Sequence, residues 1–514
     1  MLRFAQHDSG RGVWGTYLWD TTLAARGESV PGARFLKNGL VRKTGTPENG
    51  DMAMGTRKQG ERQEELWIAK ADLPRTAGHP FYERLNGLLE EAGFDGFVEE
   101  RCRRFYAEKM GRPSLAPGIY FRLLLLGYFE GLDSERGMAW RAADSLALRS
   151  FLRIGLDEAP PDHSTISRTR RLIDVETHRE VFTWALGVIA EKGLLQGKTL
   201  GIDATTLEAN AALRSIVRRD SGESYPEFLA KLAQESGIAT PTREELARLD
   251  RKREKKSSNQ DWEHPHDPDA RITKMKDGST HLAHQAEHAV DLETGAVVAV
   301  TVQGADQGDT TTLQETFVEA AEQLVAVGKE PAADERMNAQ GLEEVVTDKG
   351  YHSGAMLEDL REIGVRSYIP EPQRGRRHWQ GKPDEQAAVY GNRRRIRGER
   401  GKRLLRQRGE LLERTFAHVY DTGGMRRTHL RGHRNILKRL LVHVAAFNLS
   451  LILRREIGMG TPRGLQGRWN CVFFCLWLVG RLLEGLREPF ARQQVLSAGR
   501  FRFQSLPHQS LCAA

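Results

Sequence analysis

The chain has 514 residues, 39% of them hydrophobic and 28% charged, which is typical of a soluble globular protein with room for two or three domains. Its most apolar stretch, Cys471–Gly480, is far shorter than the roughly 20 residues of a membrane span, so a buried helix is expected there. The formal net charge of +8 and pI near 9.3 favour an acidic partner, with nucleic acid first and a membrane surface second.

The four cysteines are Cys102, Cys471, Cys475 and Cys512. They form no Cys-x-x-Cys pair and no Cys/His zinc spacing, which is typical of a reduced, cytosolic protein. Residues 1–50 are polar and rich in glycine, so the sequence predicts no secretory signal.

The first structured region is predicted to be helical. Apolar residues recur at steps of three and four from about Pro80. Ser114 is expected to cap a strongly apolar helix over Ile119–Phe129, and Glu135–Leu148 is expected to form another. Pro160 and Pro161 then interrupt the series.

The segment after these prolines, Asp162–Leu172, predicts a short basic helix capped by Asp162 or Ser164. It carries four residues that can reach phosphates and base edges: Ser167, Arg168, Arg170 and Arg171. With helices before it, this is the outline of a helix-turn-helix that binds the major groove. The alternative is an exposed basic helix in a structural bundle.

Farther along, the hydrophobic period changes to that of a sheet, and a charged stretch of about 210–278 interrupts it. The expected elements are strands at 199–205, 280–290, 296–302, 344–347 and 365–369, and helices at 309–327, 353–363, 410–419 and 433–455. Asp309 is expected to cap the first of these helices. The order predicts a mixed sheet covered by helices.

Three acidic residues stand out in this region. Asp203 and Asp348 belong to strand-like runs and Glu413 to a helical one, with separations of 348 − 203 = 145 and 413 − 348 = 65 residues. Two carboxylates at strand ends and one on a helix can hold a pair of divalent cations for in-line displacement at a phosphodiester. Each acid alone also has an ordinary structural explanation, as a turn or surface residue.

A basic block directly precedes Glu413. Residues 374–408 contain 13 Lys or Arg against three acids, a local net charge of +10. This block is expected to bind a nucleic-acid backbone. A solvated or disordered basic loop is the alternative.

The sequence motifs around the three acids resemble the signature blocks of bacterial insertion-sequence transposases of the DDE type, in the IS-four/IS-five group. These motifs are Gly-Ile-Asp-Ala-Thr (Gly201–Thr205), Thr-Asp-Lys-Gly-Tyr (Thr347–Tyr351) and Glu-Arg-Thr-Phe-Ala-His (Glu413–His418). The likeness continues through Gly423–Gly432 and Ala445–Leu449. Upstream, Ser114–Ile173 is similar to the helical N-terminal domain of the same transposases, so the resemblance covers about residues 75–455.

The resemblance implies an α/β fold, in which an all-α, helix-turn-helix-like domain precedes a ribonuclease-H-like mixed-sheet catalytic domain with an insertion. The implied organisation is a poorly ordered extension (1–74), the helical DNA-binding domain (75–190), the catalytic domain (191–455, insertion about 210–278) and a tail (456–514).

The same resemblance implies a site and its partners. Asp203, Asp348 and Glu413 would bind Mg²⁺, for which Mn²⁺ can substitute. DNA contacts or bracing would come from matching motif positions and the basic helix, namely Lys349, Tyr351, Arg414, Arg426, Arg427, Arg431, Ser167, Arg168 and Arg170. The implied substrate is double-stranded DNA, at the terminal inverted repeats and at the target. A homodimer on DNA, no membrane, and a cytoplasmic, nucleoid-associated location are expected.

Several alternatives remain at this stage. Glu410 lies one helical turn before Glu413 and could supply the third carboxylate. His284 and Gln285 stand where relatives tend to carry an aromatic residue and a lysine. The chain could also be a catalytically inactive DNA-binding descendant, or a nuclease that does not join strands.

Overall fold

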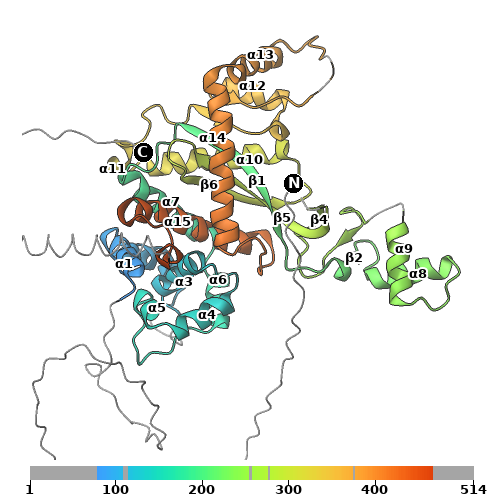
Figure 1. The fold of residues 1–514 in the computed structure, drawn as a ribbon, viewed down its shortest axis with the longest axis horizontal. Helices are drawn as coiled ribbons and strands as arrows, with labels where there is room; N and C mark the ends of the chain where they lie inside the picture. The colour runs from blue at the N-terminus through green and yellow to red at the C-terminus, as the bar shows by residue number, and fades with distance from the viewer. Residues whose placement is uncertain are drawn as a thin grey trace, which may run out of the picture. The chain divides into compact units, whose positions relative to one another are not determined.

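The computed structural model describes residues 78–107, 114–253, 257–275, 278–373, 375 and 377–466 (Figure 1). The expected N-terminal extension, the expected helix at Cys471–Gly480 and most of the expected tail lie outside these residues. From Arg75 onwards the chain forms one unit by its internal contacts. The helical region and the sheet region both belong to this unit.

Helices occupy the described chain before the sheet. They are α1 (Pro80–Glu91), α2 (Phe94–Cys102), α3 (Pro117–Glu130), α4 (Glu135–Asp144), α5 (Leu146–Phe151), α6 (His163–Leu172) and α7 (Val175–Glu191). Helix α3 is buried along nearly its whole length, as its apolar sequence requires. Cys102, at the end of α2, is a buried free thiol.

Two boundaries in this region differ from the sequence-based expectation. Ser114 does not cap α3, which starts at Pro117 after Ala116, because a proline at the first helical position has its φ already set and needs no hydrogen-bond partner. The single helix expected over Glu135–Leu148 is two helices. Ser145 has an extended backbone and its hydroxyl accepts the N–H of Leu148, so it ends α4 and caps α5.

A mixed sheet carries the second half of the chain. Its strands are β1 (Thr199–Glu208), β4 (Arg271–Lys274), β5 (Thr280–Asp291), β6 (Val297–Gly304), β7 (Glu344–Val346) and β8 (Arg366–Tyr368). The order of hydrogen-bonded strands in the sheet is β4-β5-β1-β7-β8. Strand β5 also pairs with β6, next to the stretch of β5 that pairs with β4. Strands β1, β7 and β8 are parallel to one another, whereas β5 is antiparallel to β1. The expected mixed sheet, with its β5–β6 hairpin, is confirmed.

Helices cover both faces of this sheet (Figure 1). They are α10 (Asp309–Val327), α11 (Pro331–Asp334), α12 (Gly354–Glu362), α13 (Pro383–Arg397), α14 (Glu399–Phe416), a π-helical turn (Ala417–Thr422) and α15 (His433–Ile457). Helix α10 bonds Glu287 of β5 through Thr312, on the face of β1 that carries Ala204. Helix α14 contacts the opposite face, at Gly201. The basic block is therefore helical over 383–397 and 399–408, which carry most of its Lys and Arg residues, and not a loop there.

The interrupting segment has its own small core. It contains β2 (Val217–Arg218), α8 (Tyr225–Glu235), α9 (Arg243–Lys252) and β3 (Trp262–Glu263). Both helices begin with a capping box, from Ser224 and Thr242. Buried Ile216, Tyr225 and Trp262 form a cluster separate from the main core. The insertion thus folds around its own apolar residues beside β4 and β5.

Helix α15 joins the helical region to the sheet. It packs on α7, α3 and β6. Buried Asn448 donates to the carbonyl of Val297 at 2.8 Å and accepts its N–H at 2.9 Å. The segment 433–464 is long and apolar enough, by composition, to cross a membrane, but 89% of its apolar window is buried inside the protein. Its apolar character is therefore explained by packing.

Three buried histidines make the folded state sensitive to acid. Burial lowers the pKa of His178 and of His288 to about 3, and that of His443 well below its usual value. These values lie below the unfolded value of about 6.5, so unfolding takes up protons once the pH falls below 6.5. Each such histidine then costs about 1.4 kcal/mol of stability per pH unit, down to its folded-state pKa.

We expect the free energy of unfolding, measured by urea denaturation, to fall steeply between pH 7 and pH 5. His178→Gln removes one titrating group and should reduce this loss. His378→Gln, at an exposed position, should not. Equal pH dependence in all three proteins would contradict the assignment of the acid sensitivity to His178.

Candidate active site

The candidate site lies where β1 and β7 run side by side. Gly201 pairs with Val346 in this parallel ladder, an offset of 346 − 201 = 145 residues. Asp203 and Asp348 have the same offset, 348 − 203 = 145, so they lie in register two residues beyond the last paired residues. Neighbouring residues of parallel strands project to the same face, so the register brings the two carboxylates together, as the sequence predicts.

A close helix–strand contact places α14 over this point. A Cβ atom on Gly201 would lie 2.7 Å from Leu292 Cδ2, 3.1 Å from Leu412 Cδ1 and 3.2 Å from Arg408 Cγ. Only glycine leaves room for such an approach. Residues two apart on a strand share a face, so α14 covers the face that also carries Asp203 and Thr205.

Asp203 is held by two partners. One oxygen, Oδ1, accepts the N–H of Ala204 at 2.9 Å, and the other, Oδ2, pairs with the Arg408 guanidinium at 2.7 Å. The side chains of Arg408 and Asp203 are only 12% and 28% exposed. Burial raises the pKa of Asp203 to about 6; Arg408 and the Ala204 N–H oppose this rise, whereas Asp348 and Asp309 add to it. The site therefore concentrates negative charge.

Asp348 caps the turn that follows β7. Its Oδ1 accepts the N–H of Gly350 at 2.7 Å, at the start of the 3-10 turn Lys349–Tyr351. Tyr351 is fully buried, and its hydroxyl donates to Glu287 at 2.7 Å. Tyr351 is expected either to contact DNA or to brace the site. Its ring does not reach the surface, so the structure favours the bracing role.

Asp309, which is expected from the sequence only as a helix cap, is a third acid at this site. Gly308 is the N-cap of α10, so the capping role is wrong. A Cβ on Gly350 would touch the carboxylates of both Asp309 and Asp348, and Gln285 donates to Asp309 at 3.3 Å. Burial, then the charge of Asp348, raises the pKa of Asp309. Asp309 is separated from β6 by residues 305–308, so no local sequence signal marks it as Asp348 is marked.

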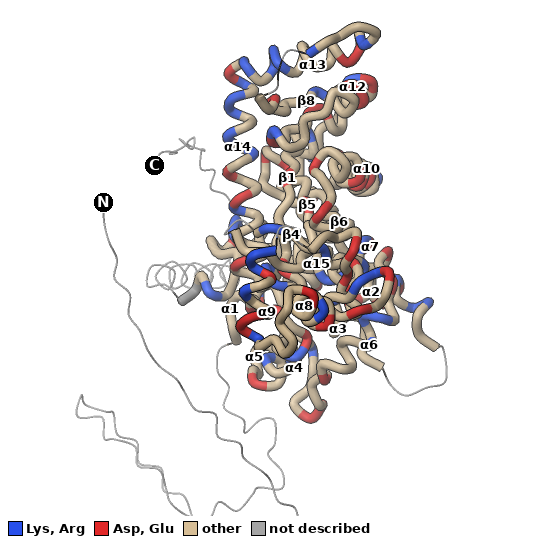
Figure 2. Tube along the Cα trace, turned by 90° about the vertical axis from the view of Figure 1, so that its right-hand side faces the viewer, with Lys and Arg blue, Asp and Glu red and all other residues tan. Residues whose placement is uncertain are grey.

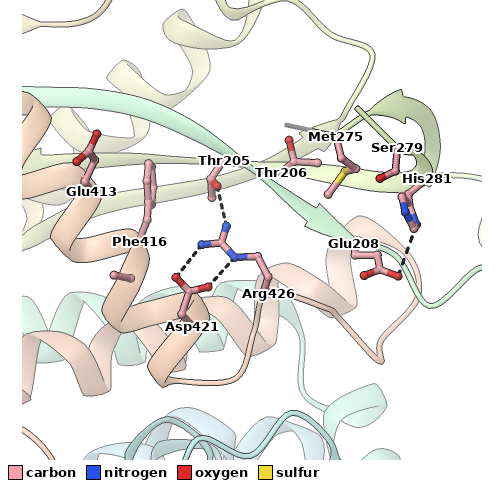
Figure 3. Close-up of a pocket in the computed structure, with 11 residues that line it drawn as sticks. Thr205, Thr206, Glu208, Met275, Ser279, His281, Glu413, Phe416, Asp421 and Arg426 are labelled. Carbon is pink, nitrogen blue, oxygen red and sulfur yellow. Dashed lines mark hydrogen bonds and ion pairs between the residues drawn. The ribbon is translucent and has the colours of Figure 1, made fainter. Parts of the chain in front are cut away.

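Glu413 lines a cavity that includes Thr205, two residues after Asp203 on β1, but neither Asp203 nor Asp348. The cavity has a volume of about 490 Å³, and Glu413 lies at one end of it in Figure 3, with Thr205 and Phe416 next along the wall. Arg426 lies farther along, bonded to Thr205 and Asp421. Because Thr205 shares the face of Asp203, Glu413 is on the correct side of the strand to serve this site.

Glu410 is placed differently from Glu413. It does not line this cavity, and its carboxylate pairs with Arg414 at 2.6 Å. Glu413 is exposed, and its carboxylate has no ion pair or hydrogen bond among the described residues. The geometry therefore favours Glu413 over Glu410 as a third carboxylate.

The donor set fits a hard divalent cation in its chemistry. Asp203, Asp348 and Asp309 offer carboxylate oxygens, the ligands that Mg²⁺ prefers, and their mutual repulsion would be relieved by a cation. Within the described parts of the chain, however, no group of three His, Cys, Asp or Glu residues is arranged to hold a metal ion. The α14 side chain that reaches Asp203 is Arg408, and Glu413 lies apart.

The residues expected to contact DNA fall into three groups. Lys349, Arg168 and Arg431 are exposed. Ser167 accepts a bond from Arg170, and three arginines are paired with acids on the protein, namely Arg414 with Glu410, Arg426 with Asp421 and Arg427 with Glu208. Arg170 is only 7% exposed and bonds Glu135 and Asn435, so the expected DNA contact is corrected to a structural one.

His284 and Gln285 also have structural partners. His284 is fully buried and contacts Asp267 of the insertion at 3.3 Å, while Gln285 holds Asp309. This part of β5 therefore connects the insertion with the acid cluster.

The basic block forms an exposed row on α13 and α14. Figure 2 shows Lys and Arg along both helices. Four of these arginines are exposed and have no ion pair within the described chain: Arg394, Arg397, Arg403 and Arg406. Arg403, Arg406 and Glu413 lie three or seven residues apart and so share one side of α14. Positive charge thus leads along the helix to Glu413.

Comparison with protein families accounts for this arrangement. A Transposase domain (DUF772) matches residues 70–172, and the Transposase DDE domain matches residues 205–449. The chain belongs to the DDE transposases. No curated protein and no solved structure matches it. The fold is the helical region followed by a ribonuclease-H-like mixed sheet that this family implies, and transposition is its general function. The second match begins two residues after Asp203, so the strand register is what connects Asp203 to the site.

The close contact at Gly201 can be tested by its effect on stability. We expect Gly201→Ala to destabilise the protein by about 1–3 kcal/mol, because the added methyl overlaps Leu292 and pushes α14 off β1. Gly409→Ala in α14 is the matched control, since nothing lies within 4 Å of its added Cβ. A helix-interior glycine replaced by alanine should gain up to about 1 kcal/mol.

Thermal or urea denaturation of the two variants supplies the measurement. Equal stabilities for Gly201→Ala and the wild type would show that α14 is not seated against β1 as described.

Proposed function

We propose that the protein is an active transposase of the IS-four/IS-five type, which cleaves DNA at the terminal inverted repeats of an insertion sequence and joins the freed 3′ ends to target DNA. The observation that carries this proposal is the β1–β7 register, which aligns Asp203 within β1 with Asp348 just after β7. Membership of the DDE transposases supports it.

Asp203, Asp348 and Glu413 would hold Mg²⁺, with Mn²⁺ as a substitute, and Asp309 would add charge beside them. Bound there, divalent cations activate the attacking oxygen and stabilise the leaving oxygen at phosphorus. The chain itself holds the strand ends that present the carboxylates: Tyr351 and Thr312 fix Glu287 between β5 and α10, and Gly350 fixes Asp348. Asp309 is half-buried, which limits the access of water to this side of the cluster.

The basic surface would hold the DNA. The exposed arginines of α13 and α14, together with Lys349, would bind phosphates near the acids, and Arg168 and Ser167 on α6 would contact the element end. The sequence-based domain organisation remains part of this proposal, with residues 75–190 binding DNA and 191–455 carrying the chemistry. A dimer on DNA follows from the need to process two ends together, and a cytoplasmic, nucleoid-associated location follows from the substrate.

A gel assay tests the catalytic proposal. It uses labelled DNA from the flanks of the gene, a target plasmid and Mg²⁺ or Mn²⁺. We expect the wild type to give cleaved and joined products, and Asp348→Asn to bind the DNA without forming either. Asp384→Asn is the matched control, because this acid is 72% exposed on α13, and it should behave as the wild type.

Each other outcome identifies a different protein. Products from Asp348→Asn would remove Asp348 from the catalytic set. Cleavage without joined products would indicate a nuclease that does not transfer strands. Binding without any product from the wild type, while a known active transposase works in the same buffer, would indicate a catalytically inactive DNA-binding protein.

DNA binding should depend strongly on salt. If six phosphates are neutralised, the affinity should fall on the order of a thousandfold between 50 and 200 mM salt. Replacing Arg394, Arg397, Arg403 and Arg406 by Gln should make the slope of log K against log salt shallower by about three to four units.

The control replaces Arg243, Arg248, Arg251 and Lys252 of α9 by Gln. This helix also carries three acids, Glu244, Glu245 and Asp250, so its loss of positive charge should leave the slope nearly unchanged. Fluorescence anisotropy at several salt concentrations supplies the data. Equal slopes for the wild type and the α13–α14 variant would show that this row does not touch the backbone of DNA.

A further inference from the structure

Arg408 occupies a position that the proposed metal site needs. Its guanidinium pairs with Asp203 Oδ2 at 2.7 Å and also lies 3.4 Å from the carbonyl of Ile202. The pair is largely shielded from water, and the other oxygen of Asp203 is taken by the Ala204 N–H. In the structure, Arg408 is thus the positive charge that balances Asp203.

The geometry of α14 makes Arg408 and Glu413 alternatives for the same position. Five residues separate them, which turns their side chains about 140° apart on a helix of 3.6 residues per turn. Arg408 and Leu412 face β1 at Gly201, whereas Glu413 is exposed and lines the cavity at Thr205, farther along β1. A rigid α14 cannot direct both side chains at Asp203 together.

We propose that Arg408 is a positioning residue that acts as a built-in counter-cation: it holds Asp203 when no metal is bound and competes with the divalent cation for this carboxylate. The proposal rests on the proposed function, since it takes Asp203 as a metal ligand. A cation bound by Asp203 would have to displace the Arg408 guanidinium from this carboxylate.

The contacts of α14 show why this pair is distinct from the other ion pairs of the helix. Arg400, two turns earlier, donates to Glu344 at 3.2 Å, at the start of β7 and away from Asp348. Glu344 is 1% exposed and also bonds Thr199 and Tyr368, so this pair joins α14 to the sheet. Arg400 thus provides a matched control: a partly buried arginine–carboxylate pair on the same helix that does not involve the acid cluster.

The test is a titration of Mn²⁺ into the full chain without DNA, in which isothermal titration calorimetry measures the dissociation constant. We expect Arg408→Gln to bind Mn²⁺ at least about fivefold more tightly than the wild type, because a competing positive charge is gone. Arg408→Lys keeps the charge and should stay within about twofold of the wild type. Arg400→Gln should leave the dissociation constant unchanged.

A double variant shows whether the effect passes through Asp203. The gain from Arg408→Gln should disappear in the Asp203→Asn background, as a coupled pair requires. Circular dichroism checks that each protein is folded. If Arg408→Gln does not fold, Arg408→Met keeps the apolar stem against Gly201 and gives the same comparison.

The outcomes separate this proposal from the proposed function. Unchanged or weaker Mn²⁺ binding by a folded Arg408→Gln protein overturns the counter-cation role. If the wild type still loses its binding on Asp203→Asn, the metal site itself stands. Binding of Mn²⁺ that is the same in the wild type, Arg408→Gln and Asp203→Asn overturns both.

Discussion

The parallel pairing of β1 with β7 is the constraint on which the site depends. It sets Asp203 and Asp348 side by side although 145 residues separate them, and it leaves both just beyond the last paired residues. Side chains on the ordered part of a sheet have little freedom, so the two carboxylates cannot move apart to relieve their repulsion. Burial and the nearby charge raise the pKa of Asp203, and the Arg408 guanidinium balances its negative charge.

Much of the fold could be predicted because its signals are local. The β5–β6 hairpin follows from alternating strands around an Asp-Leu-Glu-Thr-Gly turn, and α6 follows from Asp162, whose carboxylate accepts the N–H of Ser164. Boundaries were less predictable where two local signals competed. A proline start replaced the expected serine cap of α3, and a serine in the middle of an apolar pattern divided α4 from α5.

The site was predictable only in part, for a physical reason. Asp203 and Asp348 could be found because each lies in a strand-like run within a recognisable motif, although β1 continues past Asp203 to Glu208 and so does not end there as expected. Arg408 and Asp309 could not, because their roles come from what lies opposite them in space: Arg408 meets Asp203 only because Gly201 lets α14 approach, and Asp309 meets Asp348 only across Gly350. Likewise, the sequence of α6 cannot show that Arg170 is bonded to Glu135 whereas Arg168, on the same helix, is exposed.

The bond between Asn448 and Val297 has a consequence for modularity. Helix α15 comes last among the long helices of the described chain, yet it packs on α7 and α3 while Asn448 binds the backbone of β6. A cut between α7 and β1 would leave α15 bonded to β6 through Asn448 and Val297, but it would expose the apolar side of α15 that packs on α7 and α3. Recombination between related elements could therefore not exchange the helical region alone. A viable hybrid would have to inherit α15 together with α3 and α7, so the specificity for DNA ends and the catalytic sheet would evolve as one inherited unit.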